Sequence, residues 1–250
     1  MPILYLRRLT GLERSLRSDI HLGLSLSFVA GAINAGGFVA VNQYTSHMTG
    51  VVSAMSDGIA MGDIRFALAA VGSLLCFIAG ATCTELMVSW ARGRQLQSEY
   101  ALPLILEAVL LLVFGFLGGE LHEHMGLFIS FTIMTLCFLM GLQNAVITRI
   151  SNAVIRTTHV TGIVTDIGIE FGRMLYWNRD VDKEDKVYIR ANRGKLALLS
   201  GLLFMFFLGG VIGAYGFQYI GYLTTAVLAA GLFLLALMPV IDDLFRWVRR

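Results

Sequence analysis

The stretch LALLSGLLFMFFLGGVIGAYGFQYIGYLTTAVLAAGLFLLALMPVI, residues 196–241, contains no Asp, Glu, Lys or Arg. It is more than twice as long as the roughly 20 apolar residues that cross the hydrocarbon core of a bilayer as a helix. Residues 20–56 and 124–148 are free of these four residue types as well. A transmembrane β-barrel would need short segments of alternating hydrophobicity, which these runs lack. They predict membrane-spanning α-helices.

The composition of the 250-residue chain agrees with a lipid environment. Charged residues make up 14%, against roughly 25% in a soluble domain, while hydrophobic types reach 56% and the mean hydropathy is +0.73. A water-soluble fold of this size could not bury so much apolar surface. The net charge of +2 is too small to indicate a polyanionic partner, so no nucleic-acid binding is expected. The expected partner is the lipid bilayer.

We expect one all-α transmembrane domain over 1–250, with six spans and two shorter apolar segments. At 1.5 Å per residue, each shorter segment makes only about 20 Å of helix, less than the hydrocarbon core of about 30 Å. The expected spans are 22–41, 66–90, 101–118, 125–147, 196–217 and 221–241, and the shorter segments are 48–61 and 160–171.

A motif occurs twice, each time at the end of a long span. GAINA (31–35) is followed by TSHMTG (45–50), and GLQNA (141–145) is followed by TTHVTG (157–162). The order and the residue types agree, which indicates a duplication with one copy over about 20–120 and the other over about 125–241.

The basic residues predict the topology. If both shorter segments enter the membrane and return, 18 of the 19 Lys and Arg residues lie on the cytoplasmic side with both termini, and the mixed-charge loop 173–195 is a cytoplasmic connector. If both segments cross instead, the division falls to 15 against 4. The six-span topology turns the two copies upside down relative to each other, an arrangement found in many transporters and channels. The arginines before the first span resemble a signal peptide, but that apolar run is too long, which favours a retained helix.

The shorter segments carry the candidate solute-binding residues at their starts. Helices beginning near Thr49 and Thr161 have unpaired first-turn amides, which a threonine hydroxyl can cap and which favour an anion or a polar oxygen. Gly50 and Gly162 allow close approach of backbone or solute. Such helix ends must face protein or a water-filled cavity.

Four further polar residues accompany them, and a fifth lies within the second segment. His47 and His159 precede the helix starts and could bind solute or pass a proton. Asn34 and Asn144 lie late in the preceding spans, and Asp166 is an intramembrane acid. The alternative for the motifs is structural: the threonines cap the short helices and the asparagines hydrogen-bond to them or between helices.

Other acidic and histidine residues are weaker candidates. Glu170 shares a helical face with Asp166, and Glu107 and Glu85 lie near the ends of spans, where they can reach water. Glu120, His122, Glu123 and His124 crowd one outer loop, but they lack a zinc-binding spacing, so we expect neither a metal nor a cofactor.

The two copies, 31–50 and 141–162, resemble the YoaK-like multi-pass membrane proteins, a bacterial family classed as a domain of unknown function. The resemblance spans most of the chain and implies a bacterial inner-membrane protein. The chain departs from the family pattern at Val51, where members often carry a polar residue. The resemblance implies no substrate or mechanism.

The leading hypothesis is a permease or channel for a small neutral or anionic solute, with the candidate residues lining a narrow polar path. The alternative is a non-transporting assembly partner or sensor in the membrane. No catalytic motif is present, so no enzymatic activity is predicted, and the sequence leaves a homo-oligomer open.

Overall fold

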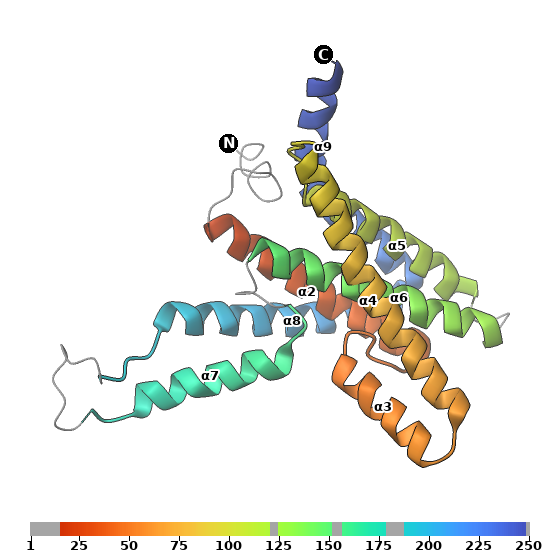
Figure 1. Ribbon diagram of the computed structural model, residues 1–250, viewed down its shortest axis with the longest axis horizontal. Helices are drawn as coiled ribbons and strands as arrows, with labels where there is room; N and C mark the ends of the chain where they lie inside the picture. Colours follow the sequence, from red (N-terminus) through yellow and green to blue (C-terminus); the bar gives the residue numbers. More distant parts are fainter. Residues whose placement is uncertain (1–15, 121–124, 152–156, 179–187, 249–250) are drawn as a thin grey trace.

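Figure 1 shows a computed structural model of the chain, which describes residues 16–120, 125–151, 157–178 and 188–248. Regular structure in these ranges is helical throughout. The helices are α2 (Leu16–Val41), α3 (Met48–Ala60), α4 (Ile64–Gly93), α5 (Ala101–Glu120), α6 (Met125–Ile150), α7 (Val160–Leu175), α8 (Arg193–Tyr219), the 3-10 turn η1 (Gly221–Leu223) and α9 (Thr224–Val248).

Within the described ranges, six helices are long and apolar enough to cross a membrane: α2, α4, α5, α6, α8 and α9. The prediction of an all-α membrane protein with six long spans is therefore confirmed. The two remaining helices, α3 and α7, have 13 and 16 residues. They reach about 20 and 24 Å, short of a hydrocarbon core of about 30 Å. Figure 1 shows them leaving the centre of the molecule in different directions, α7 beside α8 and α3 beside α4.

Glycines set the closest approach between the first half of the chain and the second. On α2 and α8, a Cβ added at Gly31 would meet the backbone of Phe206, and one at Gly209 would lie 2.7 Å from the carbonyl carbon of Phe28. No side chain fits at either position, so the two backbones pack directly against each other. Small residues at such contacts are how membrane helices gain packing contacts without a hydrophobic driving force.

The same arrangement recurs between α4 and α6. A Cβ at Gly141 would lie 2.8 Å from the carbonyl carbon of Phe77, and one at Gly80 would lie 2.8 Å from that of Phe138. The first helix of each half thus packs on the third helix of the other half, through a reciprocal pair of glycine and phenylalanine backbones. A duplication predicts this recurrence.

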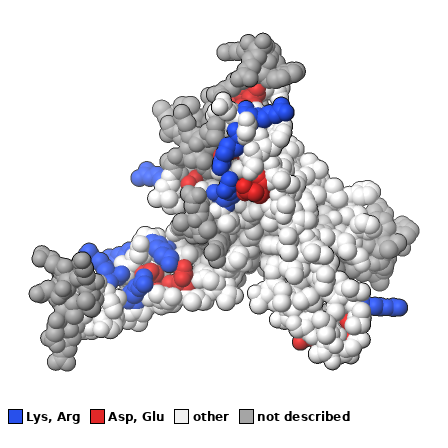
Figure 2. Space-filling view, in the orientation of Figure 1, with Lys and Arg blue, Asp and Glu red and all other residues white. Residues whose placement is uncertain are grey.

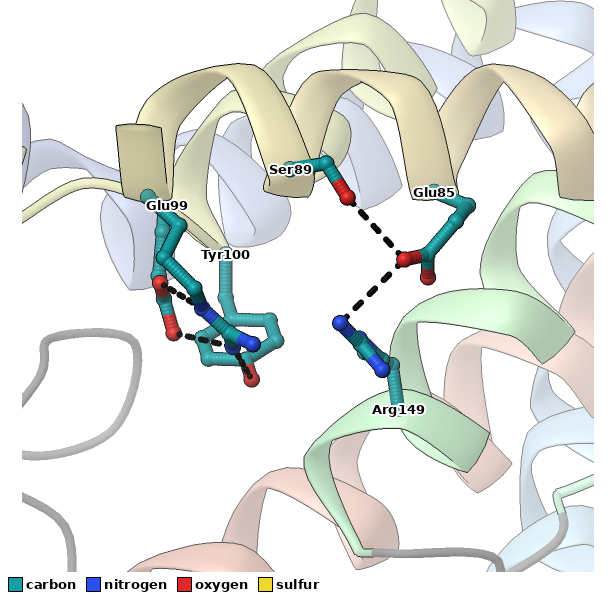
Figure 3. Close-up of polar contacts among 6 residues, drawn as sticks. Glu85, Ser89, Glu99, Tyr100 and Arg149 are labelled. Carbon is teal, nitrogen blue, oxygen red and sulfur yellow. Dashed lines mark hydrogen bonds and ion pairs between the residues drawn. The ribbon is translucent and has the colours of Figure 1, made fainter. Parts of the chain in front are cut away.

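The charged residues gather at the ends of helices. Figure 2 shows an uncharged surface over most of the molecule, with acidic and basic side chains together at the C-terminal end of α4 and along the outer parts of α7 and α8. At the C-terminal end of α4, Arg149 Nη2 lies 3.2 Å from Glu85 Oε1, which also accepts a hydrogen bond from Ser89 (Figure 3). Glu85 therefore forms an ion pair near the end of its helix.

The start of α4 provides a stability prediction. Asp63 precedes the helix, and its Oδ1 accepts a hydrogen bond of 3.0 Å from the amide of Phe66. Asp63→Ala removes this cap, and the free energy of unfolding should fall by about 1 kcal/mol. The measurement is SDS titration of purified protein in mixed micelles.

Asp57→Ala is the matched control, because Asp57 is exposed on the neighbouring α3 and its carboxylate has no hydrogen bond among the described contacts. An equal loss in both variants would show that charge rather than capping is responsible.

Candidate functional site: a cleft at two helix N-termini

The starts of α3 and α7 have open backbone amides. His47 and His159 occupy the N-cap positions, and neither side chain makes a capping hydrogen bond. Within the described ranges, the amides of Thr49, Gly50, Thr161 and Gly162 donate no hydrogen bond. The prediction that a threonine hydroxyl caps each helix is wrong, because Thr49 and Thr161 follow the N-cap residue instead of occupying its position.

Both helix starts face one open cleft of about 900 Å³, which is called the central cleft below. Six of the nine candidate residues line it: Asn34, His47, Thr49, His159, Thr161 and Gly162. The remaining walls are mostly apolar and come from α2, α4, α8, the segments before α3 and α7, and the first residue of each of these short helices. These further lining residues are Gly31, Ala35, Phe38, Val39, Tyr44, Ser46, Met48, Phe77, Thr158, Val160, Leu203, Phe206, Phe207, Gly210, Val211 and Ala214.

Three candidate residues lie elsewhere. Gly50 lines a smaller cleft of about 310 Å³ on the other side of His47. Asn144 is buried, and Asp166 Oδ2 pairs with Lys195 Nζ at 3.0 Å. Asn144 and Asp166 therefore do not line the 900 Å³ cleft, although Asn144 is hydrogen-bonded to Thr158, which does.

The asparagines of the two copies hold the segments that precede the short helices. Ser46 Oγ donates to Asn34 Oδ1 over 3.0 Å, and Thr158 Oγ1 donates to Asn144 Oδ1 over 2.7 Å. Asn144 also donates from Nδ2 to the carbonyl of Met140. The structural alternative thus holds for the asparagines, while Asn34 lines the cleft as well. Each hydrogen bond fixes a helix start against the preceding span.

His47 lies between the two clefts and lines both, together with Tyr44. A Cβ added at Gly50 would lie 2.8 Å from Nδ1 of His47. The glycine of the first motif therefore leaves room for the imidazole at the boundary between the clefts. At Gly162, by contrast, no atom lies within 4 Å of an added Cβ, so the second motif leaves open space there.

The remaining acids lie outside the cleft. Glu170 is buried and accepts hydrogen bonds from Arg173 Nη1 over 2.8 Å and from the amide of Asn192 over 2.7 Å. Its carboxylate therefore joins the last turns of α7 to the residue that precedes α8. Glu107 is fully buried on α5, and neither of its oxygens has a partner among the described residues.

Among the residues that the structure describes, no three His, Cys, Asp or Glu side chains lie close enough together to hold a metal ion. Of the outer loop suggested as a weak metal site, His122, Glu123 and His124 lie outside the described residues, as does the side chain of Glu120.

Sequence reasoning missed the apolar walls and Tyr44. The phenylalanines of α8 follow no motif, and only the packing of α2 on α8 brings Phe206 beside the first motif. Ser46 and Thr158 could have been found, since both belong to the repeated T-[ST]-H-x-T-G.

The fold and the cleft define a class: multi-pass α-helical membrane proteins in which two short helices begin at a common cleft. The profile of the family described as "Protein of unknown function (DUF1275)" matches residues 22–238, and the chain belongs to this family. The resemblance to the YoaK-like proteins is consistent with it. No curated protein and no solved structure matches the chain significantly.

Proposed function

We propose that this protein is a permease or channel for a small solute that is neutral or anionic. One observation carries the proposal: the N-termini of α3 and α7, from the two halves of the chain, face the same cleft with open amides. Short helices that begin at a shared site within the membrane are a recurring feature of transporters, whose substrates bind at such helix ends.

The chemistry of the cleft favours an anion or a polar oxygen. Two helix N-termini each contribute a partial positive charge and free N–H donors. None of the described residues lining the cleft is Asp, Glu, Lys or Arg, so the cleft holds no fixed charge that would attract a cation. The two histidines and three threonines that line the cleft add side-chain donors and acceptors, and the apolar walls limit the solute to one with little charge.

We further propose a location in the bacterial inner membrane, with both termini in the cytoplasm. The basic residues support this orientation. In the same frame, α3 runs from the cleft toward the outer side, where α4 begins, and α7 runs from the cleft toward the cytoplasmic side, where α8 begins.

The experiment measures solute entry into proteoliposomes by stopped-flow light scattering, with urea, sodium formate and sodium nitrate as probes. Wild-type protein should accelerate the entry of at least one probe over protein-free liposomes. The double variant His47→Ala, His159→Ala should lower that acceleration by tenfold or more, since it removes a side chain at each helix start. His21→Ala on α2, outside the lining, is the matched control and should match wild type.

A second measurement needs no solute. In a background without the three cysteines, Thr49→Cys and Thr161→Cys should both react with a small water-soluble thiol reagent, while Thr132→Cys, which is fully buried, should not. Unreactive cysteines at both helix starts, together with no acceleration of any probe, would contradict transport and favour an assembly partner or sensor.

A further inference from the structure

The two halves differ at one matched place. In the first half, the 310 Å³ cleft extends from His47 between α3, α4 and the beginning of α6. Its walls include small side chains on α3 and α4, namely Ala54, Ala69, Ala70 and Ser73. Because α4 begins and α6 begins at this end of the molecule, the cleft lies on the outer side in the proposed orientation.

The glycine contacts give the matching positions in the second half. Phe77 and Gly80 of α4 make the contacts that Phe206 and Gly209 make on α8. The two pairs have the same spacing, so each residue of α4 corresponds to one residue of α8 at a constant difference in residue number. His47 and His159, the N-cap residues, match α3 to α7. Asp166 then takes the place of Ala54.

On α8, larger side chains take the places of the small ones. The same offset puts Lys195 at the place of Phe66 and puts Leu198, Leu199 and Leu202 at the places of Ala69, Ala70 and Ser73. Leu199 and Leu202 are buried. On α7, Ile163 takes the place of Val51 and is only 4% exposed, whereas Val51 lines the open cleft.

An ion pair links the two helices at this place. Asp166 Oδ2 lies 3.0 Å from Lys195 Nζ, and the two side chains are 43% and 44% exposed. The pair joins the middle of α7 to the start of α8 at the cytoplasmic end of the proposed path.

We propose that the Asp166–Lys195 ion pair closes the cytoplasmic entrance to the central cleft, at the place where the first half holds an open cleft. This inference rests on the proposed function. It gives Asp166 a role in access to the path, although the side chain does not line the central cleft. The conformation described here is then open to the outer side and closed to the cytoplasm.

The test measures access from the cytoplasmic side. Ile163→Cys, in a background without the native cysteines, is labelled with a membrane-impermeant maleimide in inside-out membrane vesicles. With the ion pair intact, labelling should be slow. Asp166→Asn or Lys195→Gln should raise the labelling rate about two- to fivefold, the effect expected when a half-exposed ion pair that favours the closed state is lost. The exchanged pair Asp166→Lys, Lys195→Asp should restore slow labelling.

Glu85→Gln is the matched control, because Glu85 and Arg149 form another half-exposed ion pair that joins two helices, α4 and α6 (Figure 3). It should leave the labelling rate of Ile163→Cys unchanged. If Ile163→Cys does not fold, Gly162→Cys replaces it, since the space beside Gly162 is open.

Equal labelling with and without the ion pair, at both cysteine positions, would overturn the inference. This failure is distinguishable from failure of the proposed function, because labelling is read without any solute. Faster labelling in Asp166→Asn with no solute entry in proteoliposomes would support a cytoplasmic closure and contradict transport of the probes.

Discussion

Replacing Gly162 with tryptophan is expected to abolish solute entry through this protein while leaving it folded. Gly162 lies at the start of α7 and lines the central cleft, and no atom lies within 4 Å of a Cβ added there. The indole can therefore enter the cleft without displacing the backbone, and it would cover the open amides of the helix start. Solute entry in proteoliposomes should fall more than tenfold, and the midpoint of thermal unfolding should stay close to wild type.

Gly172→Trp provides the control on the same helix. Gly172 also has no atom within 4 Å of an added Cβ, but it lies two to three turns further along α7, outside the cleft lining. Solute entry at the wild-type rate in Gly172→Trp and its loss in Gly162→Trp would locate the path at the helix start. Undiminished entry in Gly162→Trp would place the path elsewhere.

The second large effect concerns folding. Gly80→Ala on α4 places a Cβ 2.8 Å from the carbonyl carbon of Phe138 and 3.0 Å from the amide nitrogen of Leu142. Both atoms belong to the backbone of α6, so no side chain can rotate away and the two helices must separate. We expect the free energy of unfolding to fall by about 3 kcal/mol, at the upper end of what overpacking costs. SDS titration in mixed micelles measures the loss.

Gly72→Ala is the matched control, also on α4. A Cβ there would meet only the end of the Met134 side chain, at 3.5 Å, an ordinary contact with a flexible group. Since alanine favours a helix over glycine by about 1 kcal/mol, this variant should be as stable as wild type or slightly more stable. Equal stability of the two variants would show that α4 and α6 do not approach through Gly80.

The helices themselves could be predicted because their physical cause is local. A run without charges that is long enough to span the hydrocarbon core becomes a helix wherever it packs, and each of the six expected spans lies within a helical segment of the structure. The repeated motifs predicted where the two short helices begin for the same reason, because glycine and the other residues around a helix start affect the backbone within one turn.

The partners of individual side chains could not be predicted in this way. Asp166 was predicted to line the path because an acid within an apolar segment needs an explanation. Its partner Lys195 is 29 positions away at the start of another helix, and only the packing of α7 on α8 brings the two together. The apolar cleft walls depend likewise on the rotation of α8 about its axis, which the glycine contacts with α2 determine.

The reciprocal backbone contacts also constrain biosynthesis. Because α2 packs most closely on α8, and α4 packs on α6, neither half of the chain contains both helices of either close contact. The ribosome must synthesise α8 before α2, which leaves the translocon earlier, can pack against its partner. Long-range contacts of this kind slow folding. A nascent chain truncated after α5 should therefore remain a substrate for quality-control proteases, however well its helices have inserted.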